Sequence, residues 1–266
     1  MFSNFSNMPS NMFNEKFKVF TFLLIFIGLN STQAFADEVR VAVASNFYPA
    51  MKEIALQYEL KKSKTSENHK IVLIPGSSGR HYAQIMNGAP FDLFFSADKV
   101  RPILLEKKGI SENGSRFTYA LGKLVLWSSL DGFVEKEERL YHKDLRFIAI
   151  ANPKIAPYGV AAKEALISIN LWEDMKSKLI RGENIAQTFQ FVNSGNAKLG
   201  FVSYSQLMNP NYPVGGSFWM VPQSLYKPIE QQAVLLRESL LGKDFLSFMR
   251  TDQSLKIISK FGYDLP

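Results

Sequence analysis

The sequence predicts an α/β protein with largely parallel sheets, and three observations lead to this prediction. Short apolar segments alternate with segments of helical periodicity, which is the pattern of parallel strands joined by helices. Several apolar segments end in small or hydroxylated residues directly before a helix begins. The chain has 266 residues, and 230 remain after an N-terminal leader. That length allows two lobes of about a hundred residues each.

Residues 1–36 contain the three parts of a secretory signal peptide in the usual order. Two lysines form a basic start, an apolar run covers Val19–Leu29, and Ala34 and Ala36 are the small residues of a cleavage site. The apolar run is shorter than the roughly twenty residues that a membrane-spanning helix needs. We therefore expect cleavage near Ala36 and export to the periplasm. A buried N-terminal helix is the alternative.

The expected strands are short and rich in β-branched and aromatic residues. They are Val39–Ser45, Lys70–Pro75, Asp92–Ser96, Lys123–Ser128, Arg146–Ala151, Leu199–Ser203 and Gln232–Leu236. Helices are expected to begin near Phe47, Arg80, Gly159 and Ile185. Apolar residues between Met51 and Tyr58 repeat at intervals of three and four, which places them on one face of the first helix. Two glycines stand where helical patterns end and suit C-terminal caps, namely Gly88 and Gly195.

Two segments are candidates for crossings between lobes. They are Phe117–Gly122 and the proline-marked stretch Val221–Ile229. With a crossing at each, residues 37–119 and 226–266 form lobe I, and residues 120–225 form lobe II. Loops within a single domain are the alternative.

Composition excludes several classes of protein. The formal net charge is +7, and removal of the leader, with its two basic residues and one acidic residue, leaves +6. The basic residues are scattered, so the chain lacks a nucleic-acid-binding stripe, although a mild positive charge assists encounter with an anion. Cysteine is absent, which excludes disulfides and thiolate chemistry. His69, His81 and His142 lack the spacing of a zinc site, and we expect no direct bond between protein and metal. His81 opens the second helix and is a candidate neighbour of any site there.

The small polar residues that precede the helices are suited to binding an anion. They are Ser45-Asn46, Gly76–Gly79, Asn152–Gly159 and Glu183-Asn184. A helix N-terminus has unpaired N–H groups and a partial positive charge, and ligands of α/β sheets bind at the carboxyl ends of the strands. Converging helix starts therefore predict an anion site without lysine or arginine, to which serine hydroxyls add donors. Ordinary helix capping is the alternative at each position.

A site made only of donors discriminates among oxyanions. Molybdate, tungstate and sulfate carry no proton near neutral pH, whereas phosphate usually retains one that needs an acceptor. A site without a carboxylate leaves that proton unpaired, at a cost of about 1–3 kcal/mol. Cavity size then separates molybdate from sulfate.

The chain resembles the periplasmic molybdate-binding proteins of molybdenum import systems over nearly all of residues 39–264. The resemblance rests on AVASNFYPAMKEIA (42–55), GSSGRHYAQIMNGAPFDLFFSAD (76–98), FTYALGKLVLWS (117–128), IANPKIAPYGVAAKEAL (150–166), GENIAQTFQFVNSGNAKLGFVSYSQ (182–206) and LYKPIEQQAVLL (225–236). It implies a two-lobed type II periplasmic binding protein fold, with mixed, mainly parallel sheets, flanking helices and two crossover strands. It also implies a monomer without cofactor that captures molybdate or tungstate and docks on the membrane permease of an ABC importer.

The resemblance also implies a set of ligand-binding residues. Ser45 and Ser78 match serines that provide hydroxyl and backbone donors, and Asn46 matches the adjoining position, which provides its backbone N–H. Tyr158 and Ile185 match positions that bind through backbone N–H groups of the second lobe.

One position departs from the pattern of the family. Some members use a tyrosine hydroxyl at the end of the Gly-Phe-Val strand, where this chain has Ser203 and then Tyr204. Successive residues of a strand point to opposite faces, so Ser203 is only a candidate sixth binding residue.

Other functions remain as alternatives. Ser224–Lys227 has the Ser-x-x-Lys spacing of some serine hydrolases, but no Ser-Asp-Asn motif accompanies it. Asp92 and Asp98 stand too far apart on an extended strand to act as an acid–base pair, and capping or a lobe contact is the better use. Sulfate is the alternative oxyanion, whereas ferric ion needs Tyr, His or carboxylate ligands that these loops lack. A regulatory sensing lobe does not agree with an export signal.

Overall fold

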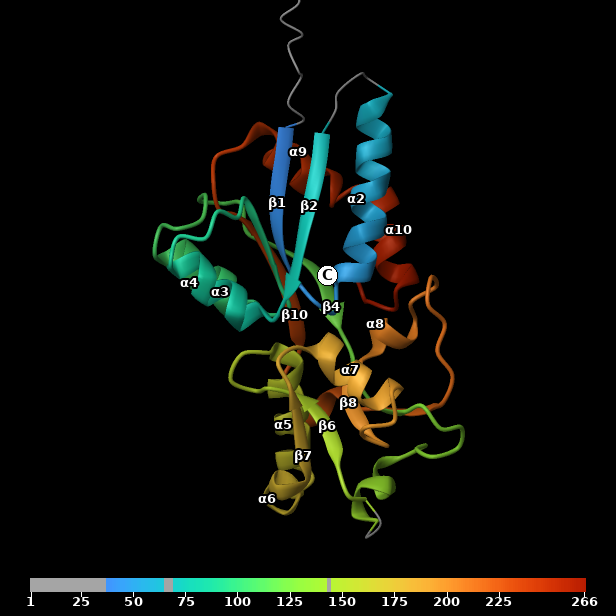
Figure 1. Ribbon diagram of the computed structural model, residues 1–266. Coiled ribbons are helices and arrows are strands. Elements are labelled where there is room, and N and C mark those ends of the chain that lie inside the picture. The colour runs from blue at the N-terminus through green and yellow to red at the C-terminus, as the bar shows by residue number, and fades with distance from the viewer. Residues whose placement is uncertain (1–36, 65–68, 143–144) are drawn as a thin grey trace, which may run out of the picture. The chain divides into compact units, whose positions relative to one another are not determined.

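The computed structural model describes residues 37–64, 69–142 and 145–266. The expected signal peptide lies outside the described residues. The described strands form two five-stranded sheets, each flanked by helices (Figure 1). No helix in these ranges is long and apolar enough to cross a membrane.

The first sheet has the strand order β2-β1-β3-β10-β4. Its strands are β1 (Asp37–Ala44), β2 (His69–Gly76), β3 (Leu93–Ser96), β4 (Phe117–Gly122) and β10 (Ile229–Leu235). β1 pairs in parallel with β2 and β3, whereas β10 pairs antiparallel with β3 and β4. Ala44 pairs with Gly76, so β1 and β2 end side by side and the loops that follow them are neighbours.

The second sheet has the strand order β7-β6-β8-β5-β9. Its strands are β5 (Leu124–Ser128), β6 (Ile148–Ala151), β7 (Leu179–Gly182), β8 (Gly200–Ser203) and β9 (Ser217–Met220). β6 is parallel to β7 and β8, and β5 is antiparallel to β8 and β9. Ala151 pairs with Gly182, which places the loops after β6 and β7 together. The repeated arrangement makes two mixed sheets, with more antiparallel pairing than the sequence predicted, because β5 and β10 run against their neighbours.

Helices cover both faces of the first sheet. The helices of the described residues are α2 (Tyr48–Ser63), α3 (Ser78–Met86), α4 (Val100–Lys107), α5 (Pro157–Ser168), α6 (Trp172–Met175), α7 (Ile185–Asn193), α8 (Tyr204–Leu207), α9 (Leu240–Phe248) and α10 (Asp252–Lys260), with short 3-10 turns at Glu137–Tyr141, Lys176–Lys178 and Gln223–Leu225. α2 and α10 lie side by side, and α3 and α4 lie on the opposite face (Figure 1). Alternate β1 residues explain this arrangement, since Val41 and Val43 join the core under α2 whereas Ala42 joins the core under α3.

Local sequence signals set the ends of α3 and α7, the helices that follow β2 and β7. The Ser77 side chain accepts a hydrogen bond from the Arg80 N–H at the start of α3, and the Asn184 side chain does the same for the Gln187 N–H of α7. Gly88 and Gly195 adopt φ values of +78° and +77° just past α3 and α7. The predicted caps are therefore confirmed.

Several elements were not predicted from the sequence. Strand β4 was expected only as a crossing segment, and β7, β9, α4, α9 and α10 were not assigned. β9 is half-exposed along its length, so its sequence lacks the continuous apolar run of a central strand. Phe117–Gly122 is both strand and crossing, because Lys123 alone separates β4 in the first sheet from β5 in the second.

Candidate functional site

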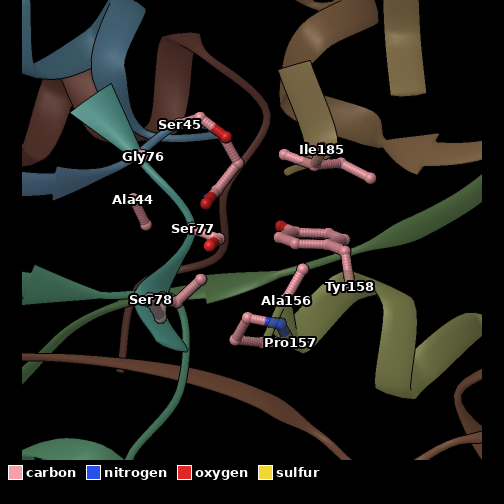
Figure 2. A pocket seen from close by; sticks show the side chains of 11 residues that line it. Ala44, Ser45, Gly76, Ser77, Ser78, Ala156, Pro157, Tyr158 and Ile185 are labelled. Atoms are coloured by element: carbon pink, nitrogen blue, oxygen red, sulfur yellow. The ribbon is translucent and has the colours of Figure 1, made fainter. Parts of the chain in front are cut away.

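A small pocket lies where the carboxyl ends of strands from the two sheets face each other. The space between its lining atoms, part of which is open to solvent, is about 190 Å³. The lining residues are Ala44, Ser45, Asn46, Gly76, Ser77, Ser78, Ala97, Ala156, Pro157, Tyr158 and Ile185. Figure 2 shows the serines on one side and Ala156, Pro157, Tyr158 and Ile185 on the other. The lining has no charged side chain.

All five residues that the family resemblance assigned to binding line this one pocket. They come from four separate loops: Ser45 and Asn46 follow β1, Ser78 follows β2, Tyr158 follows β6, and Ile185 follows β7. Strand pairing brings the loops together within each sheet, because β1 and β2 end together and β6 and β7 end together. The two pairs of loops then face each other across the pocket.

The loop after β1 is held by its own buried hydrogen bonds. The Ser45 N–H donates to the Gly76 carbonyl over 2.9 Å, so only the Ser45 hydroxyl is free for a ligand. The Asn46 side chain donates to Gln231 Oε1 (2.7 Å) and to the Tyr263 hydroxyl (3.0 Å). Tyr263 in turn donates to the Asn46 carbonyl (2.9 Å). These bonds hold the loop in place, and of its backbone N–H groups only that of Asn46 has no acceptor among the described residues.

The loop after β2 presents two serines at the start of α3. The Ser78 hydroxyl accepts a hydrogen bond from the Ala97 N–H (2.9 Å), which leaves its own hydrogen available to a ligand. Ser77 was not singled out as a binding residue, although it belongs to the Gly76–Gly79 loop that the sequence indicated and it caps α3. Its hydroxyl accepts from the Arg80 N–H at 3.4 Å and also keeps a free hydrogen.

The pocket offers backbone donors from both sheets. Among the hydrogen bonds of the described residues, none uses the N–H groups of Asn46, Ser78, Tyr158 or Ile185. Ser78 and Ile185 are the first residues of α3 and α7, and Tyr158 follows Pro157 in the first turn of α5. The first N–H groups of a helix have no acceptor within the helix, and the backbone N–H groups at these positions are therefore available to a ligand.

The Tyr158 side chain reaches past the pocket into a buried polar cluster. Its hydroxyl is fully buried and completes no hydrogen bond with any residue that the structure describes, and the same is true of Gln231 Nε2. Burial raises the Tyr158 pKa well above its usual value, and nearby Ser203 and Gln231 offset this only in part. The Tyr158 hydroxyl and Gln231 Nε2 both lie close to Gly122 of β4, where a Cβ would overlap the Tyr158 hydroxyl.

The structure does not place Ser203 in the pocket wall. Ser203 is fully buried at the end of β8, and its hydroxyl shares a 2.6 Å hydrogen bond with the Ser205 hydroxyl. Its N–H donates to Gln206 Oε1 within the capping box of α8. Tyr204 packs against Phe218 and also lies outside the lining. Capping accounts for the polar groups of this strand end.

His81 lies behind the second loop and is not part of the lining. Its ring packs edge-on against Phe91 and Phe94, and Nδ1 is 3.1 Å from Gln84 Oε1. Burial lowers the pKa of the imidazole. A Cβ on Gly76 would lie 2.6 Å from His81 Nε2, so the ring fills the space that a side chain at Gly76 would need.

The comparisons with known proteins agree with this geometry. Residues 39–264 match the family of bacterial extracellular solute-binding proteins. The chain belongs to this family. The solute-binding protein is 45% identical to the molybdate-binding protein ModA of Azotobacter vinelandii, over 90% of this chain and 94% of the relative. It is 44% identical to ModA of Rhodobacter capsulatus, over 91% and 94%.

A solved structure supports the predicted fold of this solute-binding protein. The periplasmic molybdate-binding protein of Azotobacter vinelandii superposes with a TM-score of 0.81 at 38% identity, covering 86% of this chain and 99% of that one. The fold is therefore the two-lobed type II periplasmic binding protein fold that the resemblance implied.

The residues considered for catalysis have other uses in this solute-binding protein. Ser224 is exposed in a 3-10 turn, and the exposed Lys227 Nζ lies 3.9 Å from Glu164 Oε1. Asp98 accepts a hydrogen bond from the Arg101 N–H at the start of α4, which is the capping use that the sequence favoured. Asp92 accepts from the Arg40 N–H (2.7 Å).

Proposed function

We propose that this solute-binding protein captures molybdate, and tungstate with it, between its two lobes and delivers the ion to the permease of an ABC importer. The observation that carries the proposal is one small pocket in which unpaired N–H groups from both sheets meet. Its relatives and the superposing structure are named as molybdate-binding proteins. No cofactor is needed, since the ion is cargo.

The proposed cage consists of donors alone. Ser45 and Ser78 contribute hydroxyls, and Asn46, Ser78, Tyr158 and Ile185 contribute backbone N–H groups. The N-terminal ends of α3, α5 and α7 add partial positive charge. Such a cage holds a dianion without a counter-charged side chain, and protein–metal bonds play no part in it. Ser203 is left out, since its hydroxyl is used in capping.

The proposal also covers the organisation of the chain. Residues 37–119 and 226–266 form lobe I and residues 120–225 form lobe II, with β4 and the segment before β10 as the two crossings. The mature protein is released into the periplasm by cleavage near Ala36 and acts there as a monomer. An ion that contacts both lobes favours the closed arrangement, which the permease then recognises.

Isothermal titration calorimetry with four oxyanions tests the function. We expect the mature protein to bind molybdate and tungstate tightly and phosphate far more weakly, because the lining has no carboxylate to accept the phosphate proton. An unpaired proton costs about 1–3 kcal/mol, which corresponds to roughly a 5- to 150-fold loss of affinity. Tight sulfate binding without a molybdate response would instead assign the protein to sulfate.

The Ser78→Ala substitution tests the site. We expect it to weaken molybdate binding by about 1–2 kcal/mol, because one hydroxyl donor to a charged ligand is lost. Ser111→Ala is the matched control, since Ser111 is also buried, lies outside the pocket, and its hydroxyl has no hydrogen-bond partner. Equal affinities for both variants and the wild type would remove the Ser78 hydroxyl from the proposed cage.

A further inference from the structure

A direct backbone contact joins the two sides of the pocket beside the proposed cage. The Gly79 N–H, in the first turn of α3, donates to the Ile155 carbonyl in the loop after β6, over 2.8 Å. Gly79 follows Ser78 directly, and Ile155 precedes Tyr158 by three residues. The separation of Gly79 and Ile155 therefore sets how far the donors of one lobe stand from those of the other.

The contact leaves no room for a side chain at Gly79. A Cβ there would lie 2.7 Å from both the Cα and the carbonyl oxygen of Ile155, and 2.9 Å from the Arg101 guanidinium. Real Cβ atoms do not come within 3.0 Å of other heavy atoms, and the Ile155 atoms are backbone that cannot turn aside as a flexible side chain can. The φ of Gly79 lies outside the left-handed region, so its own helix does not require glycine.

An ion pair lies next to this contact. Arg80 Nη1 is 3.3 Å from Glu183 Oε2, and both side chains are mostly exposed. Arg80 follows Gly79 in α3, and Glu183 stands two residues before Ile185 in the loop after β7. The hydrogen bond and the ion pair thus join each of the two lobe II ligand loops to the start of α3.

We propose that Gly79 is a positioning residue for lobe closure, which lets α3 approach the Ile155 backbone closely enough for both donor sets to reach one ion. This inference rests on the proposed function. The Gly79–Ile155 contact exists only while the lobes are together, so a side chain at Gly79 opposes the closed state and leaves the open state untouched. The Arg80–Glu183 pair adds a weak, salt-sensitive attraction at the same contact.

The experiment compares Gly79→Ala with Gly215→Ala in the mature protein. Gly215 is a fair control, because a Cβ there meets nothing within 4 Å and its φ is not in the left-handed region. We expect wild type and Gly215→Ala to contract in small-angle X-ray scattering when molybdate is added. Gly79→Ala should show no contraction, at least about a tenfold loss of affinity and a faster dissociation rate. Its thermal midpoint without ligand should equal that of the wild type.

A second variant keeps the test decisive if Gly79→Ala folds poorly. Arg80→Glu places like charges at an exposed position of the closed contact, and we expect dissociation about 2- to 5-fold faster. The double exchange Arg80→Glu with Glu183→Arg should restore the wild-type rate. Wild-type contraction and affinity in Gly79→Ala would overturn the inference alone. A wild-type protein that binds none of the oxyanions would overturn the proposed function and this inference together.

Discussion

Replacing Phe47 by alanine is expected to lower the free energy of unfolding by about 3–5 kcal/mol, the usual loss when a buried phenylalanine leaves a cavity. Phe47 is fully buried between the first ligand loop and α2. Its ring centroid lies 4.5 Å from that of Tyr119, 5.4 Å from that of Tyr263 and 6.4 Å from that of Phe95. The ring therefore supports the segment that carries Ser45 and Asn46, and we expect molybdate affinity to fall as well.

Urea denaturation without ligand measures the stability change. Leu240→Ala is the control, because Leu240 is 87% exposed and its removal should change the free energy by less than about 0.5 kcal/mol. A decrease in the free energy of unfolding below about 1 kcal/mol for Phe47→Ala would contradict this expectation. It would mean that the neighbouring aromatic rings fill the cavity or that the Phe47 ring contributes little to stability.

Raising the pH above about 10 is expected to lower the free energy of unfolding by up to about 4 kcal/mol per pH unit. Burial raises the pKa of the Tyr119, Tyr158 and Tyr263 hydroxyls above the usual value. In the unfolded chain these phenols lose their protons near pH 10, while the folded protein retains them. Full stability is therefore present below pH 10 and is lost as the pH rises toward the folded pKa values. Each retained proton contributes about 1.4 kcal/mol per pH unit.

Urea unfolding from about pH 9 to about pH 11 tests this dependence. Tyr158→Phe is the informative variant, because the Tyr158 hydroxyl completes no hydrogen bond and its removal perturbs the neutral state least. The slope of free energy against pH should be smaller by about 1.4 kcal/mol per unit in this variant. Identical slopes in variant and wild type would show that Tyr158 titrates at its ordinary pKa in the folded state.

Local chemistry explains which parts of the fold were predictable. The starts of α2, α3, α5 and α7 were expected within two residues of their positions, because Ser77, Asn184 and Pro157 are signals that act over a few residues. Strands with continuous apolar runs, such as β3 and β5, were also found. Half-exposed β9 and the C-terminal helices α9 and α10 were missed, since partners distant in the sequence decide them.

Five residues of the pocket lining were predictable from the sequence, but their geometry was not. The positions of the helix starts do not reveal which of their N–H and hydroxyl donors are already used in hydrogen bonds within the protein. The Ser45 N–H is used by the Gly76 carbonyl, and the Ser203 hydroxyl by Ser205, through bonds that only the assembled structure reveals. Ser77, in contrast, was expected only as a member of the Gly76–Gly79 loop, and the structure places it in the pocket lining.

The sequence by itself determined the fold class and the loops suited to an anion, because capping residues and apolar periodicity act locally. Its resemblance to known molybdate-binding proteins indicated the family. Only the tertiary structure decided that Asn46, Ser78, Tyr158 and Ile185 share one pocket. Strand pairing joins the loops within each sheet, and the two sheets then face each other, which brings together residues up to 139 positions apart in the sequence. It also decided that Gly79 contacts Ile155. The position of the Ile155 backbone, which the sequence does not reveal, determines whether a side chain fits at Gly79.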